Sequence, residues 1–203
     1  MSFTGRTARM QVGDSATPGR PEADFYRTCP EAVHALLAVE PFEGLIWEPA
    51  CGDGAISKIL IDHGKKVYSS DLYDYGYGES DRDFLITSVP DGVMHIITNP
   101  PFKLSAQFAR RGVPIIRKYG GKLALLNRLL WLEGVARKEL FADTGLSRVW
   151  VFSRRLPMMH RPGYKGKRTT PMVAFAWYVW DACNESDKTE VDWIDWRDHA
   201  PDP

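Results

Sequence analysis

Four consecutive residues near the middle of the chain, Asn99-Pro100-Pro101-Phe102, combine hydrogen-bond acceptors with a rigid backbone and an aromatic ring. The two prolines fix φ and hold the segment extended, so we expect its carbonyls to have no local partners. The Asn99 side-chain oxygen and the Pro100 carbonyl could then accept both N–H bonds of a planar amine, while Phe102 stacks on its ring. We interpret these four residues as a catalytic motif acting on an exocyclic or amide nitrogen. In isolation they could also be an Asx turn with a rigid exit.

Three acidic residues, Glu48, Asp71 and Asp83, lie upstream of this motif, the first two at the ends of predicted strands and the third just before the apolar pair Phe84-Leu85. Glu48 could meet a positively charged amino group, and Asp71 is placed to accept the two hydroxyls of a ribose. Asp83 could accept from an adenine amino group, with Phe84 packed on the adenine ring. An amino-acid end, a ribose and an adenine together describe S-adenosylmethionine. A single Asp after a strand, by contrast, is more often a helix cap.

A loop with two glycines separates Glu48 from a predicted helix, at the place where a doubly wound sheet binds its ligands. Its glycines allow the backbone to approach a ligand closely. The loop lacks the third glycine of the dinucleotide fingerprint, so a cofactor without a phosphate fits it better than NAD does. The further cofactor-binding residues that we predict here are Pro49, Ala50, Cys51, Gly52, Asp53, Gly54 and, beside Asp71, Leu72.

Apolar periodicity and turn residues predict the elements that position these side chains. The predicted helices begin at Pro30 and span 55–63 and 105–119, the last of which Pro114 could interrupt. The predicted strands span 45–47, 67–70, 94–98, 122–126, 149–152 and 173–180. Strands and helices alternate as a parallel sheet requires, and no helical pattern separates the last two strands. We therefore predict an α/β, Rossmann-like, doubly wound and mostly parallel seven-stranded sheet with a C-terminal antiparallel strand pair.

The 203 residues suffice for one α/β domain. We expect a flexible arm at 1–23, a single domain at 24–180 and an acidic tail at 181–203. The first twenty residues lack the apolar core of a secretion signal, and no apolar run reaches the roughly 18 residues of a membrane span. We therefore expect a cytoplasmic protein without a membrane partner. The three cysteines are too few and too widely spaced for a disulfide framework, and we expect no metal site.

The net charge of zero conceals a basic segment. Between Lys103 and Trp180 the chain has sixteen Lys and Arg against three acids. Such a surface suits a polyanion, because phosphate contacts supply most nonspecific affinity for nucleic acids. Within it, residues 153–170 contain no acid and are interspersed with Gly and Pro, which is typical either of a substrate-binding loop or of a solvated hairpin. The predicted substrate contacts are Arg128, Trp131, Arg154, Arg155, His160, Arg161, Tyr164, Lys165, Lys167 and Arg168, although Trp131 fits the core equally well.

With these motifs in this order, the chain resembles the amino-methyltransferases of the Rossmann-like, S-adenosylmethionine-dependent superfamily. It is most similar to the small DNA N6-adenine enzymes of phages and restriction systems. Residues 24–30 look like the family's N-terminal cofactor motif, in which a Tyr or Thr, here Tyr26 or Thr28, covers the methionine end. Residues 48–54 look like its glycine motif and residues 99–102 like its catalytic motif. The resemblance, collinear over about residues 24–130, implies methylation of a flipped adenine in DNA.

The chain departs from that family after Leu126, where about 75 residues leave no room for a separate recognition domain. Similar motifs also occur in RNA methyltransferases and, usually with Tyr as the fourth residue, in protein glutamine methyltransferases. The basic loop of residues 153–170 argues against a protein substrate, whereas RNA remains an alternative to DNA. Cytosine N4 is less favoured because that family more often has Ser at the position of Asn99. A non-catalytic nucleic-acid-binding subunit is a further alternative.

Overall fold

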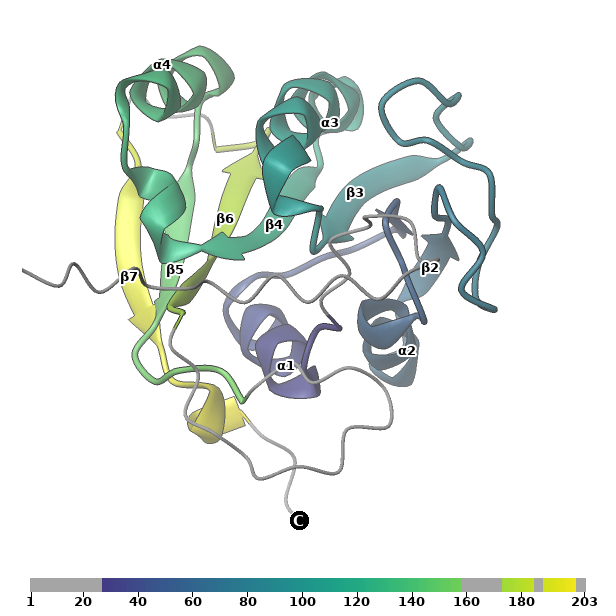
Figure 1. Cartoon of the computed structure of the whole chain (residues 1–203), viewed down its shortest axis with the longest axis horizontal. Helices are drawn as coiled ribbons and strands as arrows, with labels where there is room; N and C mark the ends of the chain where they lie inside the picture. Colours follow the sequence, from purple (N-terminus) through teal and green to yellow (C-terminus); the bar gives the residue numbers. More distant parts are fainter. Residues whose placement is uncertain (1–26, 158–172, 185–187, 200–203) are drawn as a thin grey trace, which may run out of the picture.

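The computed structural model describes residues 27–157, 173–184 and 188–199, which form one seven-stranded sheet with helices on both faces (Figure 1). The strands are β1 (Leu45–Glu48), β2 (Lys66–Ser69), β3 (Val93–Thr98), β4 (Lys122–Arg128), β5 (Arg148–Phe152), β6 (Phe175–Asp181) and β7 (Glu190–Ile194). The helices are α1 (Pro30–Val39), α2 (Ala55–Asp62), α3 (Ser105–Tyr119) and α4 (Val135–Thr144). Three 3-10 helices are η1 (Phe102–Leu104), η2 (Leu129–Leu132) and η3 (Trp196–His199).

The strand order is β2-β1-β3-β4-β6-β5-β7. Strands β1 to β4 are mutually parallel, whereas β6 runs antiparallel to both β4 and β5. The predicted fold class, a Rossmann-like, mostly parallel sheet with a C-terminal antiparallel pair, is therefore confirmed. Because parallel strands end at the same edge, the carboxyl ends of β1, β2 and β3 come together there.

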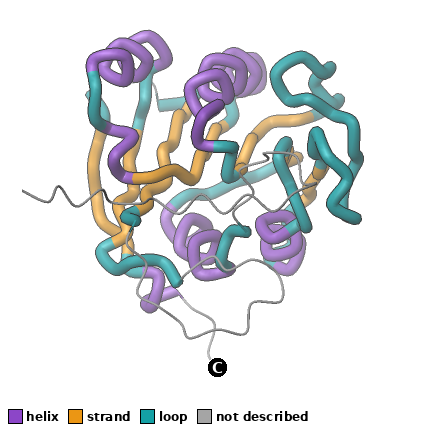
Figure 2. Tube along the Cα trace, in the orientation of Figure 1, coloured by secondary structure: helices purple, strands orange, loops and turns teal. Residues whose placement is uncertain are grey.

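Two hydrophobic clusters fill the two sides of the sheet. Helices α3 and α4 cover one face and α1 and α2 the other (Figures 1 and 2). Successive side chains of β4 point to opposite faces of the sheet, so that Leu123 and Leu125 belong to the first cluster and Ala124 and Leu126 to the second. Burial on both faces explains why the strand is a nearly continuous apolar run.

One α-helix and one strand were not predicted. Helix α4 lies between β4 and β5, and the edge strand β7, which pairs in parallel with β5, falls within the segment that we expected to be an acidic tail. Helix α3 continues through Pro114 rather than ending there. Within the part of the chain that the structure describes, no helix has the length and apolar character needed to cross a membrane.

Candidate functional site

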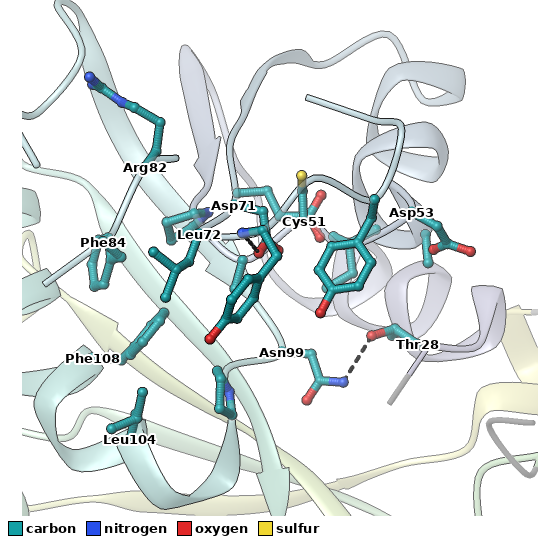
Figure 3. A pocket seen from close by; sticks show the side chains of 18 of the residues that line it. Thr28, Cys51, Asp53, Asp71, Leu72, Arg82, Phe84, Asn99, Leu104 and Phe108 are labelled. Carbon is teal, nitrogen blue, oxygen red and sulfur yellow. Dashed lines mark hydrogen bonds between the residues drawn. The ribbon is translucent and has the colours of Figure 1, made fainter. Parts of the chain in front are cut away.

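A cavity of about 340 Å³ opens at the carboxyl ends of β1, β2 and β3 (Figure 3). Most of the predicted cofactor residues line it, together with the first and third residues of the catalytic motif. These are Thr28, Glu48, Pro49, Ala50, Cys51, Asp53, Asp71, Leu72, Asp83, Phe84, Asn99 and Pro101. In Figure 3 the cavity has an apolar end, formed by Phe84, Leu104 and Phe108, and a polar end that contains Thr28 and Asp53.

Glu48, the last residue of β1, joins the cavity to the start of helix α2. Its side chain is 1% exposed, and Oε2 accepts hydrogen bonds from the backbone N–H of Ser57, at 2.8 Å, and from the Ser57 hydroxyl. Ser57 lies in the first turn of α2, where N–H groups lack intrahelical acceptors, so the Glu48 carboxyl group caps the helix. Burial raises the pKa of Glu48 to about 8, and the nearby Asp71 raises it as well. A cation placed beside Glu48 would therefore stabilise its charged form.

Asp71 holds the glycine loop against the end of β2. Its two carboxylate oxygens accept hydrogen bonds from the backbone N–H groups of Gly52, at 2.9 Å, and Tyr73, at 3.0 Å. Burial raises the pKa of this carboxyl above its ordinary value. Each oxygen retains a further lone pair with which to accept from a ligand hydroxyl.

The glycine loop itself requires glycine at Gly54, although Gly52 and Gly54 do not line the cavity. Gly54 has a φ of +78°, and a Cβ atom there would lie 2.5 Å from the ring of Tyr77. The segment that follows β2 therefore packs directly on the loop, where a side chain would prevent it.

Asp83 and Phe84 follow at the apolar end. The Oδ1 atom of Asp83 accepts from the backbone N–H of Leu85 at 2.9 Å and fixes the turn that contains both residues. The Phe84 ring is 2% exposed and packs between Trp47 and Phe108, with centroid separations of 5.1 and 4.6 Å. Phe84 thus lines the cavity from within the core.

Asn99 follows the last residue of β3 and faces the polar end of the cavity. Its Nδ2 group donates to the Thr28 hydroxyl oxygen at 3.2 Å (Figure 3). Thr28 is 5% exposed and lies just before α1, so this hydrogen bond joins the predicted N-terminal cofactor motif to the predicted catalytic motif. It also directs the Asn99 side-chain oxygen away from Thr28.

The proline pair differs from the expectation in one respect. We predicted that its carbonyls would have no local partners, but the Pro101 carbonyl accepts from the backbone N–H of Leu104 at 2.8 Å. The cause is that the chain turns at once into η1. The buried Pro100 lies before this turn, and its carbonyl takes no part in that hydrogen bond.

Phe102 does not line the cavity but faces the ends of β4 and β6. The guanidinium carbon of Arg128 lies 4.4 Å from the centroid of the Phe102 ring, and the Phe175 ring lies at 6.0 Å. Asn99 and Pro101 of the motif therefore line the cavity, whereas Phe102 packs beside Arg128 and Phe175.

The predicted substrate contacts differ in burial, and several of them lie outside the described residues. Trp131 is 7% exposed and packs against Phe141 and Tyr178, which fits the alternative that it belongs to the core. Arg154 and Arg155 are exposed after β5, where Arg154 pairs with Asp195 at 2.5 Å. The remaining predicted substrate contacts lie outside the described residues, as does the predicted cofactor residue Tyr26; these contacts are His160, Arg161, Tyr164, Lys165, Lys167 and Arg168.

Several lining residues were not predicted from the sequence. Arg27 and Arg82 are neighbours of predicted positions, and Arg27 pairs with Asp53 at 2.9 Å. Tyr73 and Tyr75 belong to a loop without periodicity, although its high tyrosine content was visible in the sequence. The others are Ala55, Ile56, Lys103, Leu104 and Phe108.

No protein family model matches the sequence, and no curated protein matches it by sequence. Solved structures do match the fold. A methyltransferase subunit of a type I restriction-modification system from Streptococcus thermophilus matches 84% of this chain, with a TM-score of 0.60 and 11% identity. The match covers 47% of that subunit, so the chain spans about half its length.

Two further structures match with similar scores. A protein from Pyrococcus horikoshii, assigned as an RNA methyltransferase, matches over 80% of this chain and 91% of its own, with a TM-score of 0.58 and 15% identity. A dimethyladenosine transferase from Plasmodium falciparum matches over 76% of this chain and 61% of its own, with a TM-score of 0.51 and 14% identity. At these identities the similarity establishes the fold, and the chain has the Rossmann-like fold of these methyltransferases.

Proposed function

We propose that this chain is an S-adenosylmethionine-dependent methyltransferase that acts on the N6 amine of a flipped adenine in DNA. The observation that carries the proposal is the position of Asn99, which lines the same cavity as Glu48, Asp71 and Asp83. A methyl donor and a target amine must meet in one place, and this edge of the sheet offers a binding residue for each. The fold that the chain shares with methyltransferases supports the same reading.

The cavity fits the cofactor in both charge and polarity. Glu48, whose pKa is raised in the protein alone, would regain its charge beside the ammonium group of the methionine part. Asp71 would accept from the ribose hydroxyls, and Asp83 from the adenine amino group. The apolar end at Phe84 and Phe108 would enclose the adenine ring. When bound, the cofactor supplies an electrophilic methyl group on a sulfonium.

The residues of this chain would make the adenine amine nucleophilic. That amine is a poor nucleophile because its lone pair is delocalised into the ring. The Asn99 side-chain oxygen and the Pro100 carbonyl would accept its two N–H bonds and push electron density onto nitrogen. Thr28 is a positioning residue in this scheme, because its hydrogen bond to Nδ2 fixes which side of the Asn99 amide faces the base. The methylated nitrogen is cationic and loses its proton readily, so no strong base is required.

The choice of nucleic acid rests on the basic surface and on the sequence resemblance. RNA is the second candidate, and it is favoured by the RNA assignment of the Pyrococcus structure. A non-catalytic subunit is less well supported, since such proteins tend to lose cofactor or catalytic residues, and here most of the predicted cofactor residues line the cavity together with Asn99 and Pro101 of the catalytic motif.

A direct test is transfer of labelled methyl groups from S-adenosylmethionine to unmethylated duplex DNA, single-stranded DNA and RNA, followed by nucleoside analysis. The proposal predicts label in N6-methyladenine from DNA. Label only in RNA would support the second candidate, and label in cytosine, guanine or protein without adenine would contradict adenine as the target. Cofactor binding with no transfer to any substrate would indicate the non-catalytic subunit.

A further inference from the structure

Arg128 covers the ring of Phe102, on which the catalytic motif is expected to stack the target base. Its guanidinium carbon lies 4.4 Å from the Phe102 ring centroid, which is a contact across the face of the ring. A base and a guanidinium are both planar, and both stack on aromatic faces at van der Waals distance. The two groups therefore cannot occupy this face at the same time.

The Arg128 side chain can move although its backbone is fixed. Residue 128 ends β4, where its N–H donates to the Asn127 side-chain oxygen at 2.8 Å and its carbonyl accepts from the Tyr178 hydroxyl at 3.0 Å. Arg128 also pairs in register with Phe175 of β6. Both hydrogen bonds are made by backbone atoms of Arg128, and its side chain is exposed. Rotation of the side chain would therefore disturb neither bond.

No acid among the described residues neutralises the charge of Arg128. Among the residues that the structure describes, no carboxylate oxygen lies within 4.0 Å of its guanidinium. Two other arginines differ, since Arg148 of β5 is paired with Glu40 and Asp181, and Arg154, which follows β5, with Asp195. Arg128 thus keeps its capacity to bind a phosphate.

We propose, on the basis of the proposed function, that Arg128 is a displaceable placeholder for the target base. In the free protein its guanidinium stacks on Phe102 and shields the ring from water. When a base enters, the stronger base–aromatic contact replaces the exposed cation–π contact, and the guanidinium moves off the ring to a backbone phosphate of the same nucleic acid. One side chain would then both close the empty base site and hold the strand once that site is filled.

The test compares two ligands, each with S-adenosylhomocysteine at saturation. The first is 2-aminopurine riboside, a fluorescent adenine analogue without a phosphate, and the second is a single-stranded oligonucleotide that contains one 2-aminopurine. Arg128→Ala should bind the nucleoside about two- to fivefold more tightly than the wild type, because the competing cation–π contact is gone. The same variant should bind the oligonucleotide more weakly at low salt, with a log–log salt slope smaller by about 0.7.

Two further variants sharpen the result. Arg128→Lys keeps the charge and should restore the wild-type salt slope. Arg137→Ala is the matched control, because Arg137 lies over the Trp131 ring, at 5.8 Å, rather than over Phe102. It should leave nucleoside affinity unchanged. Weaker or unchanged nucleoside binding by Arg128→Ala would overturn the placeholder, even if the wild type methylates adenine. Absence of methyl transfer by the wild type would instead contradict the proposed function.

Discussion

Replacing Glu48 by Gln should change how the stability of the protein depends on pH. Glu48 is buried at the end of β1, and burial raises its pKa to about 8 from an ordinary value of 4.5. Between these values the folded state holds a proton that the unfolded state has released, so the free energy of unfolding falls as pH rises. The contribution is fully present below about pH 4.5 and is lost as pH rises through about 8.

The magnitude follows from the size of the shift. One fully displaced proton changes the free energy of unfolding by about 1.4 kcal/mol per pH unit, which sets an upper bound of about 4 kcal/mol between pH 5 and 8. Gln cannot ionise, yet its side-chain oxygen can still accept from the Ser57 N–H that Glu48 caps. Glu48→Gln should therefore resemble the wild type at pH 5 and become progressively more stable than it towards pH 8.

Urea unfolding of the wild type and of Glu48→Gln at each pH from 5 to 8 measures this difference. Asp74→Asn is the matched control, because Asp74 is an exposed carboxylate after β2 and is not among the charges that shift the pKa of Glu48. Parallel pH profiles for the wild type and Glu48→Gln would refute the reasoning. Under the proposed function, the variant should also bind S-adenosylmethionine about tenfold or more weakly, because a charge-assisted contact is lost.

Three further substitutions test the glycine loop after β1, the buried ion pair between Arg148 and Glu40, and the hydrogen bond between Thr28 and Asn99. Gly54→Ala should lower stability by about 1–3 kcal/mol, measured by thermal unfolding, because of its positive φ and the close approach of Tyr77; an unchanged Tm would contradict that packing. Arg148→Met should lower the free energy of unfolding, measured in urea, by about 3–5 kcal/mol, because Glu40 is 2% exposed and loses its main partner. A decrease of less than about 1 kcal/mol would mean that the pair is not buried as described. Thr28→Val should lower kcat in methyl-transfer assays by a larger factor than it weakens cofactor binding, with Thr28→Ser as the active control; equal loss in both variants would exclude the hydroxyl as the positioning group.

The sequence predicted best those elements whose burial leaves a pattern. Strand β4 is apolar on both faces, and the loop after β1 carries its glycines where the backbone must turn, so both were recognised. Helix α4 was missed because only Leu140 and Thr144 of its ten residues are buried. Strand β7 was missed because four of its five residues are exposed and its charge is acidic, as in a solvated tail.

Within the site, residues of short motifs could be predicted and residues brought together by the fold could not. Asn99 and Asp71 follow strands, and parallel strands end at a common edge, so their convergence follows from topology. The contact between Arg128 and Phe102 joins the end of β4 to η1, and no spacing in the sequence specifies it. The burial of Trp131 was likewise open until its aromatic neighbours were known.

We propose that Asn99 holds the target amine and that Asp71 binds the cofactor. Measuring methyl transfer and cofactor binding in parallel tests these two roles most directly. Single-turnover transfer to adenine in DNA and calorimetric binding of S-adenosylmethionine would be compared for the wild type, Asn99→Ala and Asp71→Ala. We predict that Asn99→Ala abolishes transfer while cofactor affinity stays near that of the wild type, and that Asp71→Ala weakens cofactor affinity first. Transfer that survives in Asn99→Ala, or loss of cofactor binding together with transfer in that variant, would contradict the assignment of Asn99 as the residue that holds the amine.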